Sequence, residues 1–270
     1  MLIGPPDTPG QRPLERQCQN RPDRAGATDC KGALHLAPTG RGYGCPVGDS
    51  GDTVLLELPG EGLWQVRNSP ARRVPSHGTY LFGSGYAIDL VPVDSSGRSR
   101  GIGWRTLLAT EDPSRFVGWG RPVTAPIGGR VVLVHDGEPD GPVRRSPVAY
   151  LGFALTQAAR VRRGVGGVAG NCVVIETRPG GPFALLAHLR QGSVGVKPGQ
   201  TVTVGEAIGE CGNSGNSVQP HVHLQVTDSM DWPNARGLPL AFISYRSAGG
   251  EVVRGAVPQE TEVIERVAGS

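Results

Sequence analysis

Short runs of β-branched and large apolar residues, each bounded by glycine or proline, most strongly limit what this chain can fold into. The 270 residues include 42 Gly and 24 Pro, while aromatic residues make up 5%. This composition favours turns and short strands over long helices. The runs lie at 53–58, 63–68, 86–93, 128–136, 171–178, 183–190, 199–211 and 221–226. Their spacing predicts an all-β fold, mainly antiparallel, of the sandwich or barrel type.

Residues 146–164 interrupt this pattern and predict one inserted helix. The apolar positions of the segment lie near helical spacing: Val148, Leu151, Leu155, Ala158 and Val161. Pro147 falls in the first turn, and Gly164 follows two arginines at the end, as is typical of helix boundaries.

Three parts are expected along the chain. Residues 1–50 are rich in Pro, Gly, Arg and Gln without sustained apolar periodicity, which predicts a flexible or poorly structured leader. Residues 51–246 contain the β-type runs and the helix, and they predict the folded domain. Residues 247–270 predict a polar C-terminal extension.

Charge, hydropathy and cysteine spacing exclude several functions. Charged residues make up 19% of the chain and the net charge is +3, so the dense positive field typical of nucleic-acid binding is missing. The sequence contains no run of about 18 apolar residues, so no transmembrane helix is expected. The five cysteines show no CxxC spacing and are not expected to bind a metal.

Two histidines one residue apart, His221 and His223, are the main candidates for chemistry. Side chains alternate between the faces of a strand, so both imidazoles are expected on one face with Val222 turned into the core. Such a pair can hold a metal and act on what the metal binds. Two unrelated polar residues on a wet face are the alternative, and the pair alone does not decide between them.

The residues before this pair resemble a family signature. KPGQTVTVGEAIGECGNSGNSVQPHVH, residues 197–223, combines a Gly-bounded hairpin, a polar loop and a proline directly before the histidines. This resembles the C-terminal signature of the lysostaphin-type, or LytM-like, zinc metallopeptidases. The resemblance covers about residues 65–245 and implies a fold of the duplicated hybrid motif type. It also implies a peptidoglycan endopeptidase that cuts short peptides with glycine or D-alanine near the cut.

By this resemblance, His223 is a ligand of one zinc ion and His221 is catalytic. The family has another catalytic histidine on a preceding strand, and FALLAHLR supplies His188 there. Strand alternation places His188 on the same face as Leu186 and opposite to Ala187. Which of the two catalytic histidines is the base stays open. No HExxH motif is present, so a glutamate base of that type is not expected.

The remaining two ligands implied by the family are an upstream His and Asp. The segment SHGTYLFGSGYAIDLV supplies His77 and Asp89, at a longer interval than is common. It resembles a variant in which a loop separates the histidine from a YAxD strand. A lone carboxylate in an apolar run is costly to bury unless it meets a cation. Asp94 is the alternative, but its segment is typical of a solvated turn.

The polar loop 212–220 is expected to form one wall of a substrate groove, and the insertion at about 135–170 is expected to form or alter another. The predicted substrate-binding residues are Asn213, Ser214, Asn216 and Ser217.

Other functions and locations are considered beside the peptidase. A non-catalytic LytM-like domain that binds wall peptides or activates another hydrolase is one alternative. Suitable residues are present at all five predicted ligand and catalytic positions, which favours the enzyme. A phosphocarrier, whose hairpins are similar, has no use for an upstream metal pair. The N-terminus lacks a charged region followed by about seven apolar residues, so no secretory signal is visible. The chain is therefore expected in the cytoplasm as written, or exported by another route or from a different start.

Overall fold

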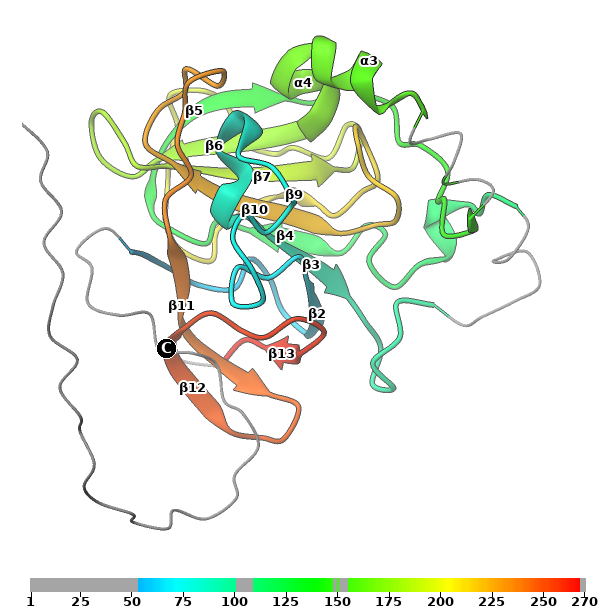
Figure 1. The fold of residues 1–270 in the computed structure, drawn as a ribbon. Coiled ribbons are helices and arrows are strands. Elements are labelled where there is room, and N and C mark those ends of the chain that lie inside the picture. The colour runs from blue at the N-terminus through cyan, green and yellow to red at the C-terminus, as the bar shows by residue number, and fades with distance from the viewer. Residues whose placement is uncertain (1–52, 101–108, 148–149, 151–154, 268–270) are drawn as a thin grey trace, which may run out of the picture. The chain divides into compact units, whose positions relative to one another are not determined.

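A large, mostly antiparallel β-sheet organises the computed structural model (Figure 1), which describes residues 53–100, 109–147, 150 and 155–267. Its strands are β1 Val54–Leu56, β2 Leu63–Arg67, β3 Ile88–Pro92, β5 Gly129–His135, β6 Asn171–Glu176, β7 Phe183–Leu189, β8 Thr201–Val202, β10 Val222–Thr227, β11 Leu240–Ser247, β12 Val252–Ala256 and β13 Val263–Glu265. They run in the order β1-β11-β13-β2-β3-β10-β7-β6-β5-β8, and β12 pairs with β11. Among the described strand pairs, β1 with β11 is parallel and the others are antiparallel. The predicted all-β, mainly antiparallel class is confirmed.

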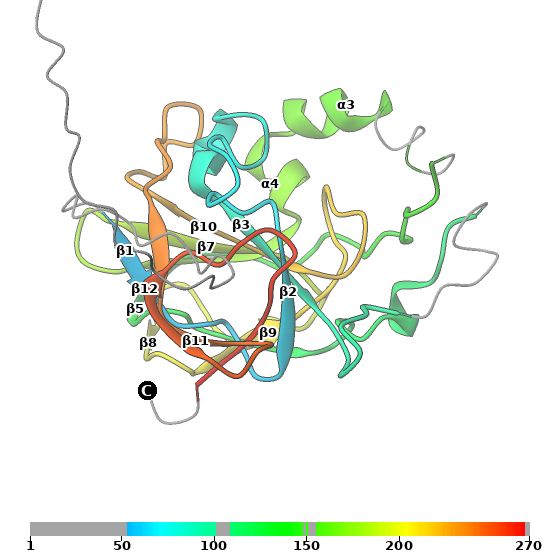
Figure 2. The same cartoon turned by 60° about the horizontal axis from the view of Figure 1, so that its bottom comes forward.

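A second, two-stranded sheet packs against this large sheet. It consists of β4 Pro122–Thr124 and β9 Ala207–Glu210. Val123 and Ile208 from the small sheet share one buried cluster with Leu186 and Leu224 from the large sheet. In the view of Figure 2, β9 lies on one side of β7 and β10, and the helices lie on the other. The main core therefore lies between two layers of strands.

Two short helices cover the other face of the large sheet. They are α3 Gln157–Arg162 and α4 Gly164–Ala169, which meet at Gly164, a residue with φ +74°. Ala169 packs with Leu185 and Ala187 of β7 in a second buried cluster. α3 lies inside the helix predicted at 146–164, while 148–149 and 151–154 lie outside the described residues.

The described residues contain no helix that is long and apolar enough to cross a membrane. The predicted leader, residues 1–50, also lies outside them.

The C-terminal residues continue the large sheet, which differs from the predicted division at 246. That position falls inside β11, and β13 pairs with both β11 and β2. Ile264 of β13 is fully buried in the main core with Trp64 and Tyr245. Residues 247–267 include many polar positions, but the buried Ala256 and Ile264 join this segment to the main core.

Replacing Ile264 by alanine is therefore expected to destabilise the fold by about 2–5 kcal/mol, the usual range for a buried Ile→Ala change. Urea denaturation measures this difference. Ile243→Ala is the matched control, because Ile243 lies on β11 and is 42% exposed. A change for Ile264→Ala no larger than that of the control would contradict the assigned burial.

Candidate metal centre

His223 and Asp89 face each other across neighbouring strands. The register of β10 and β3 pairs His223 directly with Asp89. Their strand neighbours Val222, Leu90 and Ile88 point into the main core, so alternation turns both polar side chains to the opposite face. The His223 Nδ1 lies 2.9 Å from Asp89 Oδ1, and Asp89 is only 8% exposed.

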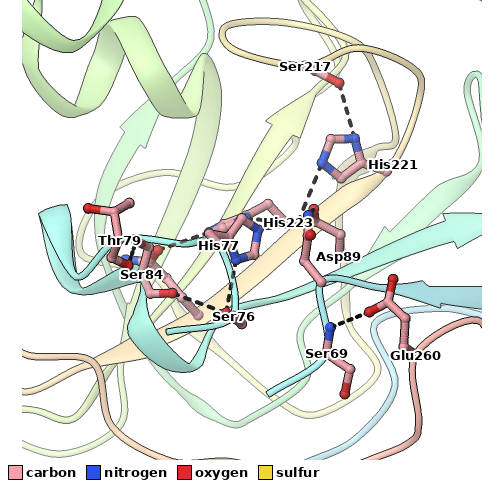
Figure 3. Close-up of polar contacts among 12 residues, drawn as sticks. Ser69, Ser76, His77, Thr79, Ser84, Asp89, Ser217, His221, His223 and Glu260 are labelled. Carbon is pink, nitrogen blue, oxygen red and sulfur yellow. Dashed lines mark hydrogen bonds and ion pairs between the residues drawn. The ribbon is translucent and has the colours of Figure 1, made fainter. Parts of the chain in front are cut away.

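His77 reaches the same carboxylate from a loop. Its Nε2 lies 3.1 Å from Asp89 Oδ1. The long interval between the two residues holds the 3-10 segment η1, Leu81–Tyr86, and the hydrogen bond from Ser76 N to Gly85 O (2.9 Å) closes this loop. One ligand atom from each of His77, Asp89 and His223 lies within 4.8 Å of the others, and Figure 3 shows these side chains converging.

Neighbouring polar groups fix which atom each of these residues offers. Ser76 Oγ lies 3.3 Å from Ser84 O and 3.0 Å from His77 Nδ1. When its hydroxyl donates to Ser84 O, it accepts from His77 Nδ1–H, and His77 Nε2 is then unprotonated in the neutral ring. Asn68 Nδ2 donates to the other carboxylate oxygen, Asp89 Oδ2, at 2.7 Å. Such outer contacts orient metal ligands in proteins.

The amide of Gln225 does the same for His223. Gln225 Nε2 donates to Phe82 O (2.9 Å), so its Oε1 accepts from His223 Nε2–H (2.9 Å). In the neutral rings, lone pairs on His77 Nε2, His223 Nδ1 and Asp89 Oδ1 then face one another. This arrangement is repulsive unless a cation lies between them or both rings take a second proton. Two imidazoles and a carboxylate are a donor set that suits a divalent metal, so the residues fit a metal site.

Two further histidines lie beside this cluster. His221 Nδ1 is 2.8 Å from Gln219 O, and His188 Nδ1 is 2.9 Å from Ser214 O. Because a carbonyl only accepts, each Nδ1 carries the proton and each Nε2 is free of one in the neutral ring. The two ring centroids are 4.7 Å apart, and His221 Nε2 lies 3.6 Å from Asp89 Oδ1. As predicted, His221 and His223 share a face.

The backbone at His188 departs from strand alternation. β7 pairs Leu189 with Asn171 and Leu186 with Val173, so Ala187 and His188 together oppose a single residue of β6. This is a β-bulge, and His188 has φ +64°. The side chain therefore lines the same pocket as Ala187, and the expectation that it lies on the face of Leu186 is wrong. The bulge turns the side chain from the core to the site.

Burial and neighbouring charges shift the pKa values in the cluster. Burial raises the pKa of Asp89, but His77 and His221 outweigh it and hold that pKa well below its usual value. Burial lowers the pKa of His221, and Asp89 reverses this, so the net shift is upward. Burial, followed by repulsion from His221 and His223, holds the pKa of His188 well below its usual value. His188 is therefore neutral and Asp89 ionised near pH 7.

A pocket of about 350 Å³ opens over the cluster. Asp89 and the four histidines line its floor. Its walls are mostly apolar and come from η1, the helical region and a loop after β10: Leu81, Phe82, Tyr150, Val161, Val168 and Trp232. This pocket gives the polar cluster an open side.

The loop predicted to bind substrate is mostly held by its own hydrogen bonds. Asn213 donates to Gly141 O (2.7 Å), Ser214 to Leu189 O (2.8 Å) and Ser217 to Gln219 O (2.8 Å). These three side chains are buried. Of the four predicted residues, Asn216 lines the pocket, and its Oδ1 accepts from Arg160 Nε (2.8 Å). Substrate contact by this loop stays a prediction.

The sequence alternative Asp94 lies elsewhere. Its Oδ1 accepts from Ser96 N and Arg98 N in an exposed turn. Three residues that contact the candidate ligands were not predicted from the sequence: Asn68, Ser76 and Gln225. Alternation along HVHLQV places Gln225 on the face of both histidines, which is a signal that could have found it. The other two come from loops and show no such pattern.

The fold and the cluster together define a β-rich protein with a candidate His–Asp–His metal centre and an adjacent histidine pair. Residues 153–234 match the model of Peptidase family M23, and this segment includes His188, His221 and His223. This match confirms the resemblance to that peptidase family over the matched segment. His77 and Asp89 lie outside the matched segment and join the site through the geometry described above.

Several solved structures are similar to this chain. The catalytic domain of lysostaphin from Staphylococcus simulans is 20% identical, with a TM-score of 0.31, over 57% of this chain and 77% of that one. A zinc-containing peptidase from Vibrio cholerae is 22% identical, with a TM-score of 0.27, over 50% and 35%. A putative glycyl-glycine endopeptidase LytM from Ruminococcus gnavus is 16% identical, with a TM-score of 0.29, over 56% and 42%.

Proposed function

We propose that this chain is a zinc-dependent endopeptidase that hydrolyses peptide bonds of the peptidoglycan type, next to glycine or D-alanine. One observation carries the proposal: one ligand atom from each of His77, Asp89 and His223 lies within 4.8 Å of the others, and all three residues line an open pocket. Catalytic zinc sites usually have three protein ligands and one open position. Three ligands with a pocket above them fit that pattern.

Zinc bound there would supply a Lewis acid that polarises the peptide carbonyl and activates a water near neutral pH. The protein residues would hold and move protons. In the neutral rings, His188 Nε2 and His221 Nε2 can each accept a proton, because Ser214 O and Gln219 O accept from the opposite ring nitrogens. One ring can take the proton of the attacking water while the other, once protonated, donates to the developing oxyanion or the leaving amine.

The pocket walls would position the peptide. Residues of η1 and of the helical region line the pocket, and the loop 212–220 contributes Asn216. Small residues such as glycine and D-alanine let a peptide backbone approach the histidines closely. The choice of peptidoglycan peptides follows from the family resemblance.

The test is to incubate the purified chain with peptidoglycan and with glycine-rich and D-alanine-containing peptides. We expect new amino termini to appear, to disappear after treatment with a chelator, and to return when zinc is added. Mass spectrometry of the products locates the cut. Near-stoichiometric zinc without cleavage of any of these substrates would contradict the peptidase and favour a wall-peptide-binding domain.

A further inference from the structure

Gln225 is a buried polar side chain in the middle of β10. It is 3% exposed, and its strand neighbours Leu224 and Val226 are core residues. An amide in such a place is costly to bury unless both ends are paired. Both are: Oε1 accepts from His223 Nε2–H and Nε2 donates to Phe82 O, each at 2.9 Å.

These two contacts link a metal ligand to a wall of the pocket. Imidazole can offer either nitrogen to a metal, and the partner of the other nitrogen decides which one. Here the accepting Oε1 keeps the proton on Nε2, so Nδ1 is left for the cluster. The orientation of the amide is not ambiguous, because the Phe82 carbonyl can only accept.

The wall end of this link is a segment with an unusual backbone. Phe82 has φ 57° and ψ 24°, a left-handed conformation that is rare for a residue with a large side chain. Gly83, also at positive φ, lies so close to Thr227 of β10 that a Cβ there would collide with the Thr227 methyl group. The hydrogen bond from Gln225 Nε2 to Phe82 O therefore holds η1 on β10, and η1 places Leu81 and Phe82 at the pocket.

We propose that Gln225 is a positioning residue with two separable roles: its Oε1 sets His223 to bind metal through Nδ1, and its Nε2 anchors the η1 wall. This inference rests on the proposed zinc site. It extends the site to a residue that is not itself one of the three ligands, and it couples metal binding to the shape of the pocket.

Three variants of the full chain test the two roles. Gln225→Met keeps the shape of the side chain and removes both hydrogen bonds. Gln225→Glu keeps an acceptor for His223 but loses the donor to Phe82 O. Thr227→Val is the matched control, since it removes a buried hydrogen bond, Thr227 Oγ1 to Ser229 O (2.9 Å), from the same strand. The readouts are the zinc Kd from chelator competition, the visible spectrum of the Co²⁺ form, and hydrogen exchange of residues 79–86.

We expect Gln225→Met to weaken zinc binding by about 10–100-fold, the usual cost of losing such a partner, and to change the Co²⁺ spectrum. Gln225→Glu keeps zinc affinity within about threefold, because its carboxylate still accepts from His223. Both variants exchange faster at 79–86, whereas Thr227→Val leaves the zinc Kd unchanged.

Two results would overturn the inference and can be told apart. If wild type binds zinc and Gln225→Met binds it equally well, or loses no more affinity than Thr227→Val, Gln225 does not position His223. If wild type itself binds no zinc, the proposed function fails and the inference fails with it.

Discussion

His223→Ala is expected to abolish detectable zinc binding and to lower kcat/KM for peptide hydrolysis by more than about 10³-fold. His223 supplies one of three ligand atoms and faces Asp89 Oδ1 at 2.9 Å. Losing the metal removes a Lewis-acid contribution of several kcal/mol, and about 4 kcal/mol corresponds to that factor. Zinc content by elemental analysis and initial rates of peptide cleavage measure the two effects.

His135→Ala is the control for losing a histidine in general. His135 ends β5 outside the cluster and the pocket, so its replacement should leave zinc content at one per chain. Circular dichroism checks that His223→Ala still folds. A folded His223→Ala variant that retains one zinc and its activity would exclude His223 as a ligand.

The sequence predicts the local part of this site well. Alternation along β10 correctly places His221 and His223 on one face with Val222 in the core. Alternation along β3 likewise turns Asp89 away from Ile88 and Leu90. The register of β10 against β3 cannot be read from any local pattern, because it pairs His223 with Asp89 across 134 positions of sequence. That register depends on the packing of the whole sheet.

Two features escape sequence analysis for physical reasons. The bulge at His188 depends on one extra residue in β7 relative to β6, and nothing in FALLAHLR marks it, because histidine is not a residue that signals left-handed backbone as glycine does. The C-terminal strand β13, Val263–Glu265, is three residues long and lies between Glu262 and Arg266, so the composition of this segment resembles an extension. Its place between β11 and β2 follows from long-range pairing alone.

Removing either histidine of the adjacent pair is expected to slow hydrolysis while leaving the metal in place. His188→Ala and His221→Ala should each lower kcat by about 10²–10⁴-fold, the usual contribution of a positioned proton-transfer group. Neither belongs to the His77–Asp89–His223 set, so zinc content should stay near one per chain. Single-turnover rates at saturating peptide measure kcat for the chemical step.

Ser217→Ala provides a matched control for His221. Ser217 Oγ lies 3.1 Å from His221 Nδ1, but Gln219 O also accepts from that nitrogen at 2.8 Å. The ring should keep its proton on Nδ1, and the loss in kcat should stay below about tenfold, well under that expected for His221→Ala. A loss as large as that of His221→Ala would mean that the serine, rather than the carbonyl, fixes the ring.

The double variant His188→Ala/His221→Ala distinguishes two rings that act as one unit from two rings that contribute independently to the rate-limiting step. Groups that act as a unit are strongly non-additive, so for such a unit the double variant should fall about as far as the slower single variant. For independent contributions to the same step the two factors should multiply. The 4.7 Å between the ring centroids, and the place of both residues in the lining of one pocket, favour a unit. Multiplied losses would instead show that each ring stabilises the transition state of the slow step on its own.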